Sequence, residues 1–393
     1  MQVETNFPQT AGAARQELAG VGAVVERSIQ AGRLVGAVVL AMRDGRLVHQ
    51  AAYGMADREA GVPMRLDALF RLASVSKPMV SAAALALVGL GVLALDQAVA
   101  DILPWFQPRL ADGVVATITL RQLLSHTAGF GYGFLEAEGG GAYRAAGVSD
   151  GMDESDLSLE ENLRRLAGVP LLYSPGEAWG YSLATDVLGA VIERASGLSL
   201  PAALARWVTQ PLGLRDTSFE VADPARLAAA YVDAEPRPRR MSDLETAPVF
   251  PGTAGLRFAP RRAFDAKAFA SGGSGMIGTA ADFLAFLESL RADDGRVLPS
   301  RLAREMARDQ AAGLTLAAWP GRGFGLGFTV LRDPQAAATP ESVGSWRLGG
   351  AYGHAWFVDP ARSLSVVALT NTAFEGMSGR FTVDLCEAVY AAL

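Results

Sequence analysis

Residues 70–80 read FRLASVSKPMV and contain the pattern S-x-x-K at Ser74 and Lys77. A long apolar helix is predicted to begin near Pro78, because proline suits a first helical turn, where its missing N–H has no partner. Residues three apart on a helix share a face, so we expect the Ser74 hydroxyl and the Lys77 amine to meet. Backbone N–H groups converge at that helix end and would stabilise a negative charge on an oxygen atom. We expect the rest of the chain to fold around this segment and hold it in position.

Lysine is scarce in this chain, which sets Lys77 apart. The sequence has 35 Lys plus Arg, but only Lys77 and Lys267 are lysines. Lys77 stands beside the apolar run Met79–Leu95. An amine can lose its proton when it is desolvated, whereas a guanidinium effectively cannot. The pattern therefore predicts an activated serine nucleophile, although S-x-x-K is short enough to occur by chance.

Length and composition limit the class of protein. At 393 residues the chain is longer than most single hydrophobic cores, so two lobes are expected. The net charge of −6, without a basic run, argues against a nucleic-acid partner. Met79–Leu95 is too short for a membrane span, and the first residues do not resemble a signal peptide, so a cytoplasmic location without a membrane partner is expected. The oligomeric state is left open.

Hydrophobic periodicity predicts an α+β fold, an antiparallel sheet flanked by the terminal helices plus an inserted mainly helical lobe. A helix over 12–32 precedes two strands joined by Asp44-Gly45, a hairpin signal. Strands are predicted at 35–42, 47–53, 323–331, 342–349, 354–358 and 364–369, and a last helix at 382–393. The predicted domains are 1–83 with 266–393 for the sheet and 84–265 for the helical lobe.

The helical lobe is expected to lack clear strands. Thr119 and Gln122 have the form of a capping box that opens a short helix. Residues 136–155 are predicted to be a mobile loop, and further helices are predicted at 160–166, 184–196 and 200–208. Two more helices, at 279–291 and 300–309, follow the lobe.

Tyr181 is the candidate for a third proton-handling group. It precedes an apolar helix that Ser182 is predicted to cap. A phenol beside an ammonium group can act first as a base and then as an acid for the leaving group. The alternative is that one tyrosine of eight precedes a helix by chance.

The segment Leu348-Gly349-Gly350-Ala351 is a candidate for holding an oxyanion. Glycines at a strand end allow a ligand to approach the backbone closely. A peptide N–H there, beside that of Ser74, would stabilise a tetrahedral oxyanion by about 2.7–4 kcal/mol per donor. An ordinary strand-to-turn transition would explain the same residues.

Histidines and Tyr132 complete the candidates. His354 and Tyr132 are expected to line the pocket, His126 to support a turn, and His49 to be structural. The three histidines and the single Cys386 form no metal-binding pattern, so neither a metal nor another cofactor is expected.

Together these motifs resemble the serine-reactive penicillin-recognising family. The resemblance covers nearly the whole chain and is strongest to the family VIII carboxylesterases, which look like class C β-lactamases. Its segments are 70–77, 123–129 (Leu-Leu-Ser-His-Thr-Ala-Gly), 181–183, 211–214 (Pro-Leu-Gly-Leu), 348–350 and 352–354. The resemblance implies that Ser74 is the nucleophile, that Lys77 and Tyr181 transfer the proton, and that the N–H groups of Ser74 and Ala351 form the oxyanion hole.

Two departures from the family pattern favour neutral substrates. Leu348-Gly349-Gly350 stands where β-lactamases have Lys-Thr-Gly, and leucine cannot pair with a substrate carboxylate. Arg347 is expected on the opposite face of the strand. Leu183 stands where β-lactamases have an asparagine. We therefore expect a serine carboxylesterase for short- to medium-chain neutral small-molecule esters; the alternatives are a β-lactamase or D-Ala-D-Ala peptidase, an acyltransferase, and a non-catalytic scaffold.

A second serine motif competes with Ser74. Residues 147–151 read G-V-S-D-G and match G-x-S-x-G, the nucleophile elbow of α/β-hydrolases. That elbow requires a strand before it and a helix after it, whereas a loop rich in Gly, Ala and Asp surrounds Ser149. We therefore expect Ser149 to be non-catalytic.

Overall fold

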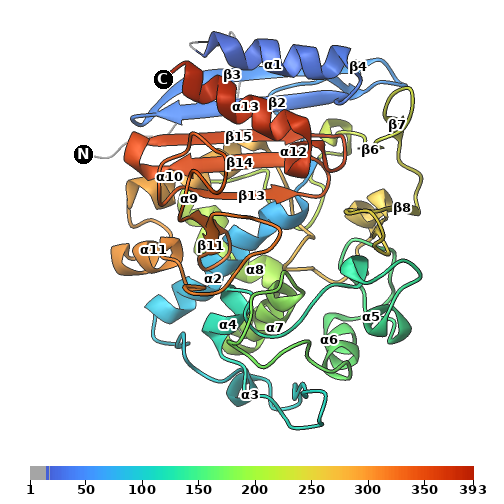
Figure 1. The fold of residues 1–393 in the computed structure, drawn as a ribbon, viewed down its shortest axis with the longest axis vertical. Coiled ribbons are helices and arrows are strands. Elements are labelled where there is room, and N and C mark those ends of the chain that lie inside the picture. The colour runs from blue at the N-terminus through green and yellow to red at the C-terminus, as the bar shows by residue number, and fades with distance from the viewer. Residues whose placement is uncertain (1–14, 17) are drawn as a thin grey trace.

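The structure is a computed structural model that describes residues 15, 16 and 18–393 (Figure 1). Within these residues, nine strands form one antiparallel sheet in the order β1-β3-β2-β15-β14-β13-β12-β11, with β4 paired to β3. The strands are β1 (Arg15–Gln16), β2 (Gly36–Arg43), β3 (Arg46–Asp57), β4 (Val62–Pro63), β11 (Arg322–Phe324), β12 (Thr329–Leu331), β13 (Trp346–Gly350), β14 (His354–Asp359) and β15 (Leu364–Thr370).

The two ends of the chain meet in the middle of this sheet. Strand β15 lies between β14 and β2, and Ala368 pairs with Val39 in that ladder. The hairpin at Asp44-Gly45 joins β2 and β3 as predicted. These pairings confirm the predicted antiparallel sheet built from both ends of the chain.

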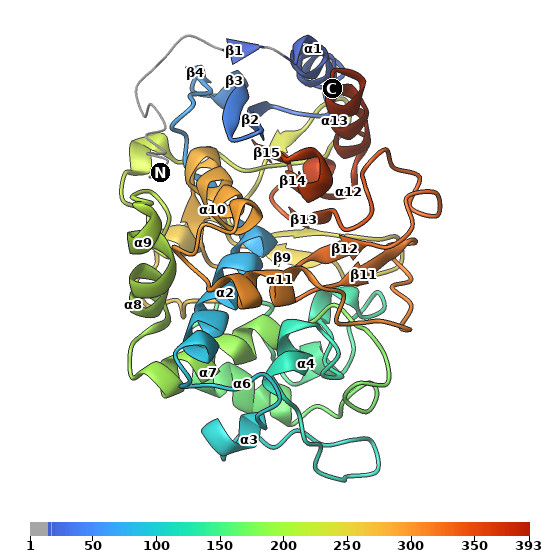
Figure 2. The same ribbon diagram turned by 90° about the vertical axis from the view of Figure 1, so that its left-hand side faces the viewer.

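Strand β2 is buried on both faces, which explains its continuous apolar sequence. Its alternate residues Ala37, Val39 and Ala41 pack into the cluster beneath helices α1 (Ala19–Gln30) and α13 (Arg380–Ala391). Val38 and Leu40 point the other way, into the larger cluster that includes α10 (Ala280–Ala292). Figure 2 shows the sheet between α1 and α13 on one side and α10 on the other. The period of two along the strand thus separates two cores.

Two predictions for the sheet region need correction. The helix predicted over 12–32 begins only at Ala19; Arg15–Gln16 forms β1 against β3, and residues 12–14 and 17 lie outside the described residues. The strand predicted over 323–331 is a hairpin of β11 and β12, because the N–H of Gly325 bonds the carbonyl of Phe328 and turns the chain. The positive φ of Gly327, 116°, requires glycine in that turn.

The middle of the chain is mainly helical, as predicted. Thr119 forms a full capping box with Gln122, and α7 has the predicted bounds. The predicted helix 200–208 continues as a π-turn (Ala205–Thr209) into α9. The helices of this part are α3 (Val99–Ile102), α4 (Leu120–Leu124), α5 (Ala142–Ala145), α6 (Leu159–Ala167), α7 (Ala184–Ser196), α8 (Leu200–Leu204) and α9 (Gln210–Leu212), and α11 (Ser300–Ala307) and α12 (Glu375–Ser378) follow later in the chain.

Two details of this middle part differ from prediction. It contains two short hairpins, β6 (Tyr231–Val232) with β7 (Arg239–Arg240) and β8 (Glu245–Ala247) with β9 (Leu256–Phe258). Strands of two or three residues are too short to show alternation. The segment 136–155 contains α5, whose first N–H groups are bonded by Glu136. No single described helix is long and apolar enough to cross a membrane. The bent pair Ala184–Ser196 and Leu200–Leu212 has the length and the apolar composition of a membrane span only when its two helices are taken together.

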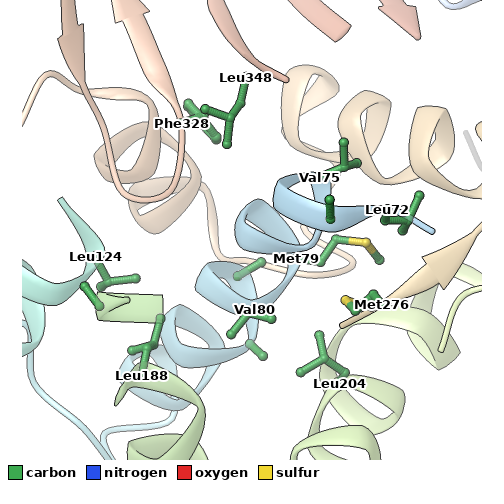
Figure 3. Packing of buried hydrophobic residues seen from close by; sticks show 14 of the residues in the cluster. Leu72, Val75, Met79, Val80, Leu124, Leu188, Leu204, Met276, Phe328 and Leu348 are labelled. Atoms are coloured by element: carbon green, nitrogen blue, oxygen red, sulfur yellow. The ribbon is translucent and has the colours of Figure 1, made fainter. Parts of the chain in front are cut away.

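Helix α2 (Ser76–Gly89) connects the sheet to the helical part. Nearly all of its residues are buried. Figure 3 shows side chains from several other elements packed around it, among them Leu124, Leu188, Leu204, Met276 and Phe328. The predicted domain boundary at 83–84 falls inside α2, and one hydrophobic cluster contains residues from both predicted domains. The division into two domains stays a prediction.

Candidate active site

Ser74 lies in a tight turn at the entrance to α2. Strand β5 (Phe70–Arg71), paired with β10 (Ile277–Gly278), leads into the 3₁₀ turn Ala73–Val75, and α2 follows at Ser76, two residues before the predicted start. Ala73 has a φ of +48°, which costs a non-glycine residue about 1–2 kcal/mol. Ala73 is fully buried, so the surrounding core holds this turn in place.

The Ser74 hydroxyl contacts both predicted partners. Nζ of Lys77 donates to Oγ of Ser74 over 3.1 Å, and Oη of Tyr181 donates to the same oxygen over 2.7 Å. Nζ of Lys77 also donates to the carbonyl of Gly273 over 2.8 Å and lies 4.8 Å from the ring centre of Tyr181. Lys77 is 1% exposed. The structure therefore brings together the three residues that the sequence singled out.

His126 holds the backbone on both sides of Tyr181. The carbonyl of His126 accepts the N–H of Gly180, and its Nδ1 accepts the N–H of Ser182 over 3.2 Å. Burial, together with the charge of Lys77, lowers the pKa of His126 well below its usual value, so its ring is neutral and Nδ1 can accept. The ring centres of His126 and Tyr181 are 5.0 Å apart. The predicted turn-supporting role of His126 is confirmed, and it acts on the turn that carries Tyr181.

Ser182 is not at the cap position of α7, although its Oγ accepts the N–H of Ala184, the first residue of that helix, over 3.4 Å. The cap position belongs to Leu183, and Oγ of Ser182 lies 3.1 Å from Nδ1 of His126. The helix begins at Ala184 as predicted, but its cap position falls one residue after Ser182, and the prediction did not include the histidine, which is distant in sequence.

Asp186 is a buried carboxylate near Lys77 that the sequence analysis missed. Its Oδ1 accepts the hydroxyl of Ser271 over 2.6 Å. Burial raises its pKa, while the hydrogen bond from Ser271, the positive charge of Lys77 and the N–H of Gly273 oppose that shift. A Cβ at Gly273 would lie 2.7 Å from Oδ2 of Asp186 and 3.5 Å from Nζ of Lys77, so only glycine fits between them. An acidic residue in the first turn of an apolar helix, five residues after Tyr181, was the available signal.

The end of β13 lies against the turn that carries Ser74. A Cβ at Gly350 would be 2.7 Å from the carbonyl oxygen of Leu72, so glycine is needed for this close approach. The carbonyl of Ala351 accepts the N–H of Phe374, which anchors the residue that follows the strand. Figure 3 shows the side chain of Leu348 next to that of Phe328. Arg347 bonds Glu341 and Thr382, away from the cavity, as the alternation of the strand predicts.

A cavity of about 330 Å³ opens onto Ser74. Its wall is mostly aromatic and aliphatic, and Trp179 and Trp319 pack on each other beside Tyr181. The lining residues are Ser74, Lys77, Tyr132, Phe134, Leu135, Asp150, Met152, Trp179, Tyr181, Val249, Phe250, Leu256, Ser274, Thr315, Ala317, Ala318, Trp319, Leu348, Gly349, Ala351 and Met377. Of the predicted substrate-binding residues, Tyr132, Leu348 and Gly349 are in this wall.

His354 and Gly350 do not line the cavity, which corrects the prediction for both. Nε2 of His354 lies 2.8 Å from the carbonyl oxygen of Arg71, and Nδ1 accepts the N–H of Thr370. Burial lowers the pKa of His354 to about 4. Because both ring nitrogens are engaged by the backbone, His354 joins the Ser74 segment to the sheet. Gly350 serves close packing instead.

Ser149 lacks the surroundings of a nucleophile elbow. It lies between α5 and α6, with a helix rather than a strand before it. Its buried hydroxyl donates to Asp153, and its N–H is bonded by Asn162. Ser149 therefore has a structural role in this loop, as expected. In the part of the chain that the structure describes, no group of three or more His, Cys, Asp or Glu side chains is arranged to hold a metal ion.

Comparison with known proteins places this geometry in context. Residues 21–385 match the family model described as Beta-lactamase. The chain is 52% identical over 374 residues to esterase EstB of Burkholderia gladioli, with 95% of each chain covered. The structure is similar to that of EstCE1, a hydrolase with promiscuous acyltransferase activity, with a TM-score of 0.90, 47% identity, and coverage of 95% of this chain and 99% of that one. Unliganded simvastatin synthase LovD of Aspergillus terreus shares the fold, with a TM-score of 0.75, 22% identity, and coverage of 96% and 99%.

Proposed function

Because this chain belongs to the beta-lactamase family, we propose that it is a serine carboxylesterase that cleaves small neutral esters through an acyl-enzyme on Ser74. The observation that carries the proposal is the convergence of Tyr181 Oη, at 2.7 Å, and Lys77 Nζ, at 3.1 Å, on the Ser74 hydroxyl. A nucleophile within hydrogen-bond reach of its proton acceptor is the arrangement that covalent catalysis requires.

The first half of the reaction forms the acyl-enzyme. Oγ of Ser74 attacks the ester carbonyl, and its proton passes to the Lys77–Tyr181 pair. The negative charge that develops on the carbonyl oxygen is stabilised by the backbone N–H groups of Ser74 and Ala351. When the tetrahedral intermediate collapses, the bond to the alcohol oxygen breaks, and the pair returns the proton to that oxygen. Water then attacks the acyl-enzyme by the same steps and releases the acid.

The wall of the cavity supports an apolar, neutral substrate. Leu348 lies where a cation would be needed to bind a substrate carboxylate, and Arg347 is turned away from the cavity. The volume of about 330 Å³ suits a short- to medium-chain ester. Tyr132 and Gly349 are placed to contact the acyl or alcohol group. The cytoplasmic location and the lack of a nucleic-acid or membrane partner stay predictions from the sequence.

Acyl transfer to an alcohol is the second candidate activity. It is favoured by the 47% identity to EstCE1, which is a hydrolase with promiscuous acyltransferase activity. An alcohol that binds in the apolar cavity would attack the same acyl-enzyme in place of water. β-Lactam or D-Ala-D-Ala cleavage has less support, because Leu348 offers no charge to the carboxylate of such substrates.

Covalent labelling tests the proposed function. A fluorophosphonate probe is expected to modify Ser74, with the adduct mapped by mass spectrometry on the intact enzyme. The substrate panel is p-nitrophenyl acetate, butyrate and octanoate with nitrocefin, and product analysis with added butanol measures acyl transfer. Labelling of Ser149 instead would show that the nucleophile belongs to the G-x-S-x-G motif at residues 147–151. No labelling and no ester turnover would favour a non-catalytic scaffold, and nitrocefin turnover matching ester turnover would favour a β-lactamase.

A further inference from the structure

Asp150 is a carboxylate in the wall of the substrate cavity that the proposed reaction does not use. Its Oδ1 accepts the N–H of Gly133 over 2.9 Å, and its Oδ2 accepts the N–H of Phe134 over 3.0 Å. These bonds hold the 3₁₀ turn Gly133–Leu135. A carboxylate oxygen has two acceptor positions, so each oxygen retains one after binding the backbone. Asp150 as a residue is half-buried, and it borders the cavity, although its carboxylate is largely desolvated.

The aromatic rings beside Asp150 can also interact with a positive charge. The rings of Tyr132 and Phe134 are stacked with their centres 4.7 Å apart, and both line the cavity. A cation near an aromatic face is attracted by the ring quadrupole. Lys77 already lies 5.5 Å from the ring centre of Tyr132, on the side of the reaction centre.

In the part of the chain that the structure describes, the cavity wall has one charged side chain of each sign, and only the acidic one has free hydrogen-bonding positions. Among the described residues that line it, Asp150 is the single acidic side chain and Lys77 the single basic one. Lys77 is engaged by Ser74 and Gly273. The free acceptor positions of Asp150 therefore leave this part of the wall able to attract a positive group and repel a negative one.

We propose that Asp150, beside the stacked rings of Tyr132 and Phe134, is a specificity-determining residue that favours esters with a cationic ammonium group and disfavours esters with a carboxylate. The inference rests on the proposed esterase function and extends its substrate class from neutral esters to esters whose alcohol carries an ammonium group. Repulsion between Asp150 and a substrate carboxylate lowers the affinity for anionic esters and leaves the affinity for neutral esters unchanged, which is enough to give specificity.

The charge of Asp150 depends on pH in a range where the enzyme can be assayed. Its pKa is raised to about 7, because burial and the neighbouring Asp153 raise it more than the N–H groups of Gly133 and Phe134 and the guanidinium of Arg144 lower it. Tyr132 and Tyr143 also face this carboxylate, and burial raises the pKa of both phenols, so they stay neutral. The ionised fraction thus rises from roughly a tenth at pH 6 to nine tenths at pH 8.

A matched pair of substrates isolates the effect of charge. Butyrylcholine and 3,3-dimethylbutyl butyrate have nearly the same shape, but only the first is cationic. In the wild-type enzyme, the ratio of their kcat/KM values is expected to rise about fivefold from pH 6 to pH 8. Effects of pH that act equally on the two esters cancel in this ratio, and the Asp150→Asn variant separates the contribution of Asp150 from that of any other group. The monobutyl ester of succinic acid should show the opposite trend.

The variant Asp150→Asn should make the ratio independent of pH. The control Asp153→Asn, outside the cavity wall, should keep the rise but move it to lower pH, because the negative charge of Asp153 raises the pKa of Asp150. Competitive inhibition of the wild-type enzyme by choline, relative to 3,3-dimethylbutanol, gives the same measurement without a variant if Asp150→Asn does not fold. A flat wild-type ratio, or a rise that persists in Asp150→Asn, would overturn the proposal while leaving ester hydrolysis intact. Loss of turnover of both esters in the wild-type enzyme would instead reject the proposed function.

Discussion

The phenol oxygen of Tyr181 lies 2.7 Å from the hydroxyl oxygen of Ser74, although the two residues are 107 positions apart in the chain. Lys77 completes the contact from the next turn of the Ser74 segment. The ring of His126 packs against that of Tyr181, and the carbonyl of Gly273 accepts a hydrogen bond from Lys77. Four separate segments therefore have to be in place before this oxygen has its partners.

Removal of the Ser74 hydroxyl should abolish esterase activity. In Ser74→Ala, the hydrolysis of p-nitrophenyl butyrate is expected to fall to background, because no acyl-enzyme can form. The matched control is Ser149→Ala, which loses its hydrogen bonds to Asp153 and to the N–H of Gly151 and about 2–3 kcal/mol of stability but keeps its kcat. Rate assays and thermal unfolding of both variants measure the difference. Activity lost in Ser149→Ala and kept in Ser74→Ala would contradict the assignment.

Removal of the Tyr181 hydroxyl should slow the chemical step without emptying the cavity. Tyr181→Phe keeps the ring that packs on His126 and Lys77. We expect kcat to fall by about 10²–10⁴, the usual contribution of a proton-transfer group, with little change in KM. Steady-state kinetics with p-nitrophenyl butyrate give both constants. A kcat within a factor of three of wild type would exclude Tyr181 from proton transfer.

Asp186 should act as a positioning residue through Lys77 and Gly273. It lies outside the cavity wall, so Asp186→Asn is expected to lower kcat about tenfold or more with KM unchanged, because Lys77 loses the negative charge near it. Asp282→Asn is the matched control. Asp282 is also buried, with the N–H of Asp216 and the hydroxyl of Thr217 as its donors. The control should lose stability and keep kcat; equal loss of kcat in both variants would indicate a general structural effect.

Acid should destabilise the fold through its buried histidines. Burial lowers the pKa of His49 and of His354 to about 4 and that of His126 well below its usual value, while the unfolded chain titrates near 6.5. For these histidines the unfolded state therefore binds more protons below pH 6.5, so their contribution to stability is full above that pH and is lost as the pH drops towards 4. The buried carboxyl groups of Asp150 and Asp282, whose pKa values are raised to about 7 and about 6, act in the opposite direction. From pH 6.5 to 5, His49 and His354 should each remove about 2 kcal/mol from the free energy of unfolding.

Urea denaturation at pH 7, 6 and 5 measures this loss. His354→Gln should be less stable than wild type at pH 7, because it alters the bonds to Arg71 and Thr370, but it should lose less stability between pH 7 and pH 5. Equal pH dependence in the two proteins would show that His354 does not titrate as proposed.

The sequence predicted those parts of the site that depend on local spacing. Ser74 and Lys77 meet because they are one turn apart, and the strand alternation places Leu348 towards the cavity and Arg347 away from it. Residues brought in by long-range packing were missed, including Asp186 and Gly273. His354 was placed wrongly, because its distance from the strand end in sequence gave no indication that its ring turns towards the backbone of Arg71.

Local sequence patterns also explain which parts of the fold were predicted and which were not. Strong periodicity gave α7 its bounds and the central strands their places. The two short hairpins β6–β7 and β8–β9 have too few residues to show alternation. Residues 323–331 are mostly apolar and were predicted as one strand, so the turn at Gly325 was missed. Dihedral features such as the positive φ of Ala73 follow from the packing around Ser74 rather than from alanine itself.

The position of β15 between β2 and β14 has a consequence for biosynthesis. While a ribosome is still making the chain, the β2–β3 hairpin has no partner along one edge until residues near 370 emerge from the exit tunnel. An open, apolar strand edge invites pairing with other chains. The nascent protein is therefore expected to need protection of the β2 edge by chaperones until β15 has emerged and paired with it.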